Sequence, residues 1–142
     1  MSFQHAAVHP LDNPAWHSLL GAHARFGVVL REAARYHPDV APFAALADDP
    51  SPACWDDIAA LYEPGAQLVL VDPPPGVPAS WTPTGQTYGV QLTGEGIDVG
   101  DEPGAIDLGP DDVAEMLDLV ERTKPGPFRP RKIGRASCRE RV

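Results

Sequence analysis

Apolar side chains recur at helical spacing in three stretches of the chain, and the first begins near residue 14. Asn13 can cap a helix, and Pro14 suits the first helical position because its missing N–H needs no partner there. Trp16, Leu19 and Leu20 follow at spacing i, i+3 and i+4, which places them on one face. The pattern predicts a short helix with one buried face.

The second stretch follows Ser51 and Pro52, a pair typical of a helix start. Its apolar positions keep helical spacing: Trp55, Ile58, Ala59 and Tyr62. Asp56 and Asp57 lie in the early turns, where the helix dipole stabilises acidic side chains. A Pro-Gly pair at residues 64–65 predicts the end of this helix.

The third stretch, residues 110–123, has the clearest helical pattern. Pro110 starts it, and Asp111 and Asp112 occupy its first turn. Its apolar side chains lie on one face: Val113, Met116, Leu117 and Val120. Pro-Gly-Pro at residues 125–127 ends it. A lone helix of this length is marginal in water, so we expect it either to dock on the N-terminal half or to fray.

Strands are predicted between these helices. Residues 26–36 are ambiguous, because Phe-x-Val-x-Leu alternation favours a strand and REAAR favours a helix. Residues 36–46 contain two prolines and suggest an extended segment or an edge strand. We also predict a buried strand at 67–71, a half-buried strand at 87–93 and a short strand at 105–109. The fold class is therefore α/β (α+β), with short helices around a small mixed sheet.

Length and composition narrow the class of protein. The 142 residues fit one domain, and no apolar run approaches the roughly 20 residues of a membrane helix. The first ten residues lack a secretory signal pattern. Cys54 and Cys138 fit no disulfide or metal framework, so a cytoplasmic location is expected.

Charge is unevenly distributed along the chain. Residues 129–142 hold six basic side chains and one acidic side chain, a formal charge of +5. Since the whole chain carries −9, residues 1–128 carry −14. An acidic body repels phosphate backbones, which argues against a nucleic-acid partner. It also offers no basic cradle for an anionic cofactor.

Several residues have chemistry that we interpret as structural. His5 and His9 have helical metal-ligand spacing, but Pro10 and the lack of a nearby carboxylate argue against a site. Cys54 stands at a helix start without a partner histidine. A further set of carboxylates, Asp111, Asp112 and Glu115, fits a charge cluster at a helix start. The tryptophans suit core contacts, although Trp81, in a loop, could line a cleft.

The run at residues 106–128, IDLGPDDVAEMLDLVERTKPGPF, resembles the opening of a domain of the GNAT family of N-acetyltransferases. That family begins with a strand, a Leu-Gly/Pro-x-Asp style of turn, a helix and a loop that borders the acceptor cleft. Further similar stretches lie at residues 13–16, 35–43 and 89–92. Their order and spacing carry the resemblance, which covers most of residues 12–131.

The resemblance implies transfer of an acetyl or acyl group from acyl-CoA to a small-molecule or peptide amine. The family binds the pyrophosphate of acetyl-CoA with a loop of the form (Gln/Arg)-x-x-Gly-x-(Gly/Ala) that runs from a strand into a helix start. We find no loop in that setting. Gly94-Glu95-Gly96 has the nearest glycine pattern, but it is acidic and leads directly into no helix. We therefore expect that this chain binds no cofactor and is itself inactive.

The same resemblance implies a substrate-side loop after the third helix: Thr123, Pro125, Gly126, Pro127 and Phe128. The family's general acid or base lies further on, so no catalytic, cofactor-binding or metal residue is assigned in this chain. The expected division is a divergent N-terminal half-domain at 1–104 and the first strand and helix of a GNAT domain at 105–131. Residues 132–142 lack strand or helix periodicity and resemble a translated adapter, a non-native tail that replaces a missing C-terminal GNAT domain.

Two other classes of function stay open. An interaction or regulatory module would be favoured by cooperative folding of residues 1–104 alone. A small hydrolase could use His37 and Asp39, although Pro38 between them makes a local turn the simpler interpretation. If the hydrolase interpretation is wrong, replacing His37 with Ala would leave any activity intact.

Overall fold

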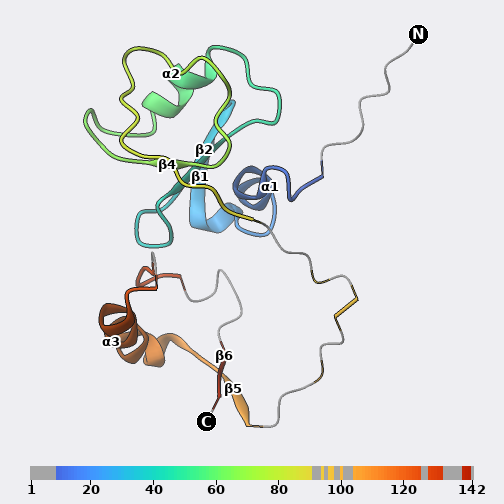
Figure 1. Ribbon diagram of the computed structural model, residues 1–142, viewed down its shortest axis with the longest axis vertical. Helices are drawn as coiled ribbons and strands as arrows, with labels where there is room; N and C mark the ends of the chain where they lie inside the picture. Colours follow the sequence, from blue (N-terminus) through green and yellow to red (C-terminus); the bar gives the residue numbers. More distant parts are fainter. Residues whose placement is uncertain are drawn as a thin grey trace.

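The structure, a computed structural model, describes residues 9–90, 94, 96–97, 100, 104–125, 128–132 and 139–141 (Figure 1). Its helices and strands are, in chain order, α1 (Pro14–Leu20), β1 (Gly27–Leu30), β2 (Ala33–Tyr36), β3 (Phe43–Leu46), α2 (Cys54–Ala59), β4 (Val69–Leu70), β5 (Ala105–Asp107), α3 (Val113–Thr123) and β6 (Arg139–Arg141). Short 3₁₀ turns precede β1 and α3. The expected mixture of short helices and a small mixed sheet is confirmed. Within the described residues, the helices are too short or too polar to cross a membrane.

The N-terminal half is built on a four-stranded sheet in the order β1-β2-β3-β4. The first three strands are antiparallel, and β4 joins β3 in parallel. Alanines dominate the two central strands, where Ala34 lies opposite Ala45 in the register. Because alternate residues point to opposite faces, Ala34 and Ala45 face α1, whereas Ala33 and Ala44 face α2. These small side chains let a helix pack closely on each face.

Two hydrophobic clusters fill the spaces between sheet and helices. Trp16 and Leu19 of α1 form the first with β2, β3 and the turn between those strands. Trp55 and Ile58 of α2 form the second with the opposite face of the sheet. The predicted buried face of α1 is thus confirmed for two of its three residues. The third, Leu20, is 53% exposed, because the helix ends there.

The ambiguous segment at residues 26–36 forms a β-hairpin, so the helical interpretation of REAAR is wrong. β1 and β2 pair from Gly27–Tyr36 to Leu30–Ala33, which leaves Arg31 and Glu32 as a two-residue turn. Arg31 has a φ of 48°, in the left-handed region where glycine is usual. A side-chain contact compensates for this conformation.

That contact joins the turn to α2 through a buried carboxylate. Asp57 is the one buried charged side chain among the described residues. Its Oδ1 accepts a hydrogen bond from Arg31 Nη1 at 2.8 Å, and its Oδ2 accepts one from the Glu32 N–H at 3.3 Å. Glu32 in turn accepts hydrogen bonds from the N–H and hydroxyl of Ser51, just before α2. The hairpin turn and the helix start are therefore held together by polar contacts.

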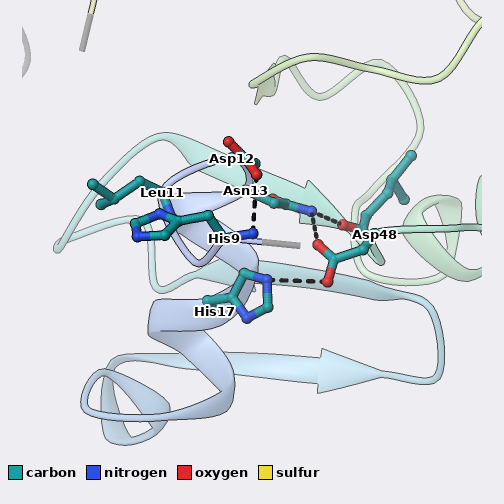
Figure 2. A network of polar contacts seen from close by, with 7 residues as sticks. His9, Leu11, Asp12, Asn13, His17 and Asp48 are labelled. Carbon is teal, nitrogen blue, oxygen red and sulfur yellow. Dashed lines mark hydrogen bonds and ion pairs between the residues drawn. The ribbon is translucent and has the colours of Figure 1, made fainter. Parts of the chain in front are cut away.

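A second polar network joins the start of α1 to the end of β3 (Figure 2). Asn13 makes no side-chain cap, so the predicted capping role is wrong. Its Nδ2 instead donates to the Leu46 carbonyl at 2.8 Å and to Asp48 Oδ1 at 3.1 Å. His17 Nε2 lies 3.0 Å from Asp48 Oδ2 as an ion-pair contact without good hydrogen-bond geometry. Asp48, just after β3, therefore contacts both Asn13 at the start of α1 and His17 within α1.

Three of the expected strand assignments need correction. Residues 67–71 supply only the two residues of β4, at the sheet edge, and Val69 and Val71 are exposed rather than buried. In the predicted strand at 87–93, residues 87–90 form no strand, and Tyr88 and Val90 are each about 90% exposed. Residues 91–93 lie outside the described part. Residues 36–46 are not an extended edge, because residues 38–40 form a turn and β3 is a central strand.

The predicted strand and helix near the C-terminus are both present. β5 pairs with β6 in an antiparallel ladder, although no strand periodicity marks the tail that contains β6. The Asp112 carboxylate accepts a hydrogen bond from the Gly109 N–H at 2.6 Å at the helix start. None of the α3 residues is buried, and α3 lies apart from the four-stranded sheet in Figure 1. The alternative of docking on the N-terminal half is therefore not observed.

Replacing Arg31 with Ala should destabilise the fold by about 2 kcal/mol, because it leaves the buried Asp57 carboxylate without its cation. Adding Asp57→Asn to the Arg31→Ala variant should recover part of this loss, since the neutral amide needs no counter-ion. Chemical denaturation followed by circular dichroism measures both. As a control, Arg122→Ala removes an exposed ion pair with Asp118 and should cost less than about 0.5 kcal/mol. Equal losses for Arg31→Ala and Arg122→Ala would contradict this account.

Candidate functional site

A cleft of about 620 Å³ lies between the end of α2, β4 and the loop that follows β4. We call it the aromatic cleft. Its apolar wall is formed mainly by Trp55, Tyr62, Leu68, Leu70 and Trp81. Clefts of this volume with mostly apolar walls are typical of small-molecule sites.

Local structure explains how the aromatic side chains meet. Trp55 lies in α2, and Tyr62 follows the end of that helix. Both side chains pack in the hydrophobic cluster between α2 and the sheet. Trp81 is oriented by a turn in which its N–H donates to the Pro78 carbonyl at 2.9 Å. Its ring centre lies 5.8 Å from that of Trp55, with the rings tilted by 52°. The expectation that Trp81 could line a cleft is confirmed.

Tyr62 is held from the side of the sheet. The Arg35 guanidinium carbon lies 4.9 Å from the centre of its ring, a cation–π contact. Burial raises the pKa of the Tyr62 hydroxyl above its usual 10.0, and the opposing effect of Arg35 is smaller. The hydroxyl is therefore neutral at physiological pH and acts as a hydrogen-bonding group.

Polar groups in the aromatic cleft are few and are mostly neutral. Gln67 contributes an amide, and Ser80, Thr82 and Thr84 contribute hydroxyls. Among the described residues that line it, Glu63 has the one charged side chain. The cleft therefore offers apolar surface, uncharged hydrogen-bonding groups and a single negative charge.

A second cleft, of about 550 Å³, lies beside the polar network of Figure 2. Four aspartates line it: Asp12, Asp48, Asp49 and Asp72. Within the described part of the chain, no group of three His, Cys, Asp or Glu side chains is placed to hold a metal ion. His9, one half of the spacing pattern with His5, accepts a hydrogen bond from the Leu11 N–H at 3.2 Å; His5 itself lies outside the described residues.

The described residues of the predicted substrate-side loop, Thr123, Pro125 and Phe128, line neither cleft. Thr123 ends α3, and its hydroxyl donates to the Leu119 carbonyl at 2.7 Å. Pro125 is exposed, and Gly126 and Pro127 lie outside the described residues. Phe128 is half-buried, with the Lys132 ammonium 5.3 Å from its ring centre. The role of this loop in substrate binding stays a prediction.

His37 and Asp39 form a local turn and do not resemble a catalytic pair. The Asp39 N–H donates to His37 Nδ1 at 3.3 Å, and the Asp39 carboxylate lies 3.6 Å from the same nitrogen. Both side chains are exposed, and neither lines a cleft described above. Neither of these two clefts would therefore serve a hydrolase built on His37 and Asp39.

Cys54 is buried at the start of α2, which indicates a structural role. Burial raises the pKa of its thiol above 9.0, and the carboxylates of Glu32 and Asp57 raise it further. These effects outweigh the hydrogen bond from the Trp55 backbone, which lowers the pKa. The thiolate that a nucleophile requires is thus disfavoured.

Residues 91–96 match the Gln-x-x-Gly-x-Gly form of the cofactor loop in full, which corrects the expectation that Gly94-Glu95-Gly96 only approaches it. Gly94 and Gly96 are exposed, and Gly96 has a φ of 77°. The described residues that follow form no helix before the turn at Pro110. Phosphate binding by such a loop needs backbone N–H groups at a helix start, and that element is not seen here.

The thiol of Cys54 makes the stability of the fold sensitive to alkaline pH. Its pKa is raised by folding, so its stabilising contribution is complete below pH 9.0 and is lost as the pH rises further. The free energy of unfolding should fall as the pH rises above 9.0. Urea denaturation of the Cys54→Ala variant should show a smaller fall over that range. The same fall in both proteins would refute this assignment.

Comparison with known proteins identifies a solved structure that is similar to nearly the whole chain. No family model matches the chain, and no curated protein matches it. A solved structure does match, that of a GNAT-family protein from Novosphingobium aromaticivorans for which acetyltransferase activity is the expected function. The two are 30% identical with a TM-score of 0.65, and the match covers 95% of this chain and 60% of the other. The resemblance of this chain to the GNAT family is therefore confirmed, and its fold is GNAT-like.

Proposed function

We propose that this chain serves the transfer of an acyl group from acyl-CoA to an amine, on the acceptor side and without holding the cofactor itself. The observation that carries the proposal is the match to the Novosphingobium protein, at 30% identity over 95% of this chain. The chain spans about 60% of the length of that relative. In this proposal it supplies the acceptor-side part of the activity. The proposed location is the cytoplasm.

The chemistry proposed for the complete enzyme is direct attack of a neutral amine on the thioester of acetyl-CoA. Backbone N–H groups polarise the thioester carbonyl, and an acid protonates the departing thiol. The two candidate groups that the sequence offers do not suit these roles. Cys54 is buried as a thiol, and the His37–Asp39 pair lies in an exposed turn. We therefore propose that the chain alone is inactive.

Electrostatics support the separation of the cofactor from this chain. Acyl-CoA carries several phosphate charges, whereas residues 1–128 carry a formal charge of −14. The charged side chain of the aromatic cleft is a carboxylate, and four aspartates line the second cleft. Neither cleft has a lysine or an arginine among its lining residues, so neither offers a cation that would bind phosphate.

The C-terminal unit supports the proposed division at residues 105–131. Its strand and helix occur in the order with which a GNAT domain opens, and none of the α3 residues is buried. An amphipathic helix normally buries its apolar face against a sheet, so a larger domain is the expected partner of α3. We propose residues 132–142 as a non-native tail. The pairing of β6 with β5 is the observation that favours a native role instead.

A binding module is the second candidate, and the position of the core favours it. Both hydrophobic clusters, with the side chains packed against them, lie within residues 15–81. An N-terminal half with its own core and its own aromatic cleft could bind a ligand without taking part in catalysis. This candidate differs from the first in needing no acyl-CoA.

The genomic sequence beyond the codon for Arg131 tests the first proposal. We expect an open frame that departs from residues 132–142 and continues into strands. It should contain an (Arg/Gln)-x-x-Gly-x-(Gly/Ala) loop directly before a helix, because the phosphates of acyl-CoA need that setting. An uninterrupted frame without such a loop would refute the proposal and leave the binding module.

A further inference from the structure

We propose that the turn at residues 37–41 is an interaction surface that captures residues 128–132 of the same chain and so holds the C-terminal unit on the N-terminal half. The interaction needs neither acyl-CoA nor an acceptor, so it goes beyond the proposed acyl transfer. Two turns that are each closed by their own hydrogen bonds, a hydrogen bond between them and their opposite charges support it.

The turn at residues 37–41 is firmly held and presents a backbone acceptor. The N–H groups of Val40 and Ala41 both donate to the His37 carbonyl, at 2.8 and 3.2 Å. The Asp39 N–H donates to the His37 ring at 3.3 Å. Val40 and Ala41 are also buried in the hydrophobic cluster on the α1 face of the sheet, which anchors the turn on the core. The Asp39 carbonyl is therefore offered from a fixed position.

A second turn follows α3 in the C-terminal unit. The Lys132 N–H donates to the Arg129 carbonyl at 3.0 Å, which closes a turn with Pro130 at its second position. Proline suits that position because its ring fixes φ near the value that the turn requires. The Lys132 ammonium lies 5.3 Å from the centre of the half-buried Phe128 ring. The segment therefore has local contacts of its own that hold its shape.

A backbone hydrogen bond joins the two turns. The Arg131 N–H donates to the Asp39 carbonyl at 2.9 Å. Figure 1 shows the segment after α3 next to the turn that leads into β3. Because each turn is already closed by its own hydrogen bonds, joining them orders few further groups, and more of the energy of the new bond remains as affinity. This contact involves the segment after α3 and not α3 itself.

The two turns carry opposite charges. Residues 128–132 contain three basic side chains and no acidic one. The exposed Asp39 carboxylate belongs to the residue whose carbonyl accepts the hydrogen bond, and residues 1–128 as a whole carry −14. His37, whose Nδ1 lies 3.6 Å from that carboxylate, is the other titratable side chain of the turn. Attraction between the turns therefore favours the contact, and salt weakens it by screening.

This interaction gives the His37–Asp39 pair a role that needs no catalysis. The pair shapes the turn, and the turn holds the C-terminal unit. The donor of the hydrogen bond, Arg131, is the last residue before the proposed non-native tail. The contact therefore does not depend on the origin of residues 133–142.

Amide hydrogen exchange of the full chain, followed by NMR, tests the contact at Arg131. The reference is the free peptide of residues 125–132, which has the sequence of the second turn but no N-terminal half. The Arg131 amide should exchange about fivefold more slowly in the chain than in the peptide, because a hydrogen bond of ordinary strength protects it. The ratio should not change with protein concentration, since both turns belong to one chain.

Two charge variants test the electrostatic part. Asp39→Lys should reduce the protection to less than about twofold, because the new cation repels Arg129 and Arg131. Asp49→Lys changes the net charge equally at an exposed position outside the turn and serves as the control. It should leave the protection of the Arg131 amide unchanged.

Two variants at Arg131 separate the backbone donor from the side chain. Arg131→Pro removes the N–H, whereas Arg131→Ala keeps it and removes only the charge. Nitrogen-15 relaxation of the α3 amides reports whether α3 tumbles with the N-terminal half. Arg131→Pro should shorten the rotational correlation time of these amides, and Arg131→Ala should shorten it less.

Four results would overturn the inference. They are equal exchange rates in chain and peptide, equal effects of Asp39→Lys and Asp49→Lys, equal α3 relaxation in the two Arg131 variants, and protection that grows with protein concentration. The last result would assign the contact to a second copy of the chain. None of these measurements contains acyl-CoA, so their failure leaves the proposed acyl transfer untouched. Conversely, a genomic frame without a cofactor loop would leave this contact in place.

Discussion

The buried carboxylate of Asp57 is the interaction on which the N-terminal half depends. It holds Arg31 and Glu32 in a two-residue turn whose backbone is unfavourable for arginine. Through the same contacts it fixes α2 against the β1–β2 hairpin. Because α2 carries Trp55 and leads into Tyr62, this contact between a buried carboxylate and a largely exposed arginine helps to position one wall of the aromatic cleft.

Alanine in the central strands has a complementary role. Ala33, Ala34, Ala44 and Ala45 are all buried and bring a helix close to each face of the sheet. The cost is a sheet with little apolar volume of its own, so the large side chains of the core come from α1 and α2. Trp16 and Leu19 fill one side, and Trp55 and Ile58 fill the other. The two helices therefore stabilise the sheet as much as the sheet positions them.

Sequence reasoning succeeded where one local rule decided the structure. Periodicity located the three α-helices of the described residues, and Pro14 and Pro110 marked two of their starts. It failed where a tertiary contact decided, as at Arg31 and Glu32, where no glycine or asparagine indicates the turn. In the cleft, Trp81 was a candidate from its loop position. The roles of Tyr62 and Glu63 depend on how the loop after β4 folds back, which no local pattern encodes.

The family resemblance and the site lead to one central claim, that this chain serves the acceptor side of acyl transfer and does not hold acyl-CoA. The chain is acidic over residues 1–128, and the glycines at 94 and 96 do not open a helix. Calorimetric titration of the chain with acetyl-CoA tests this claim most directly. The account predicts no binding heat up to millimolar cofactor, and a dissociation constant in the micromolar range would contradict it.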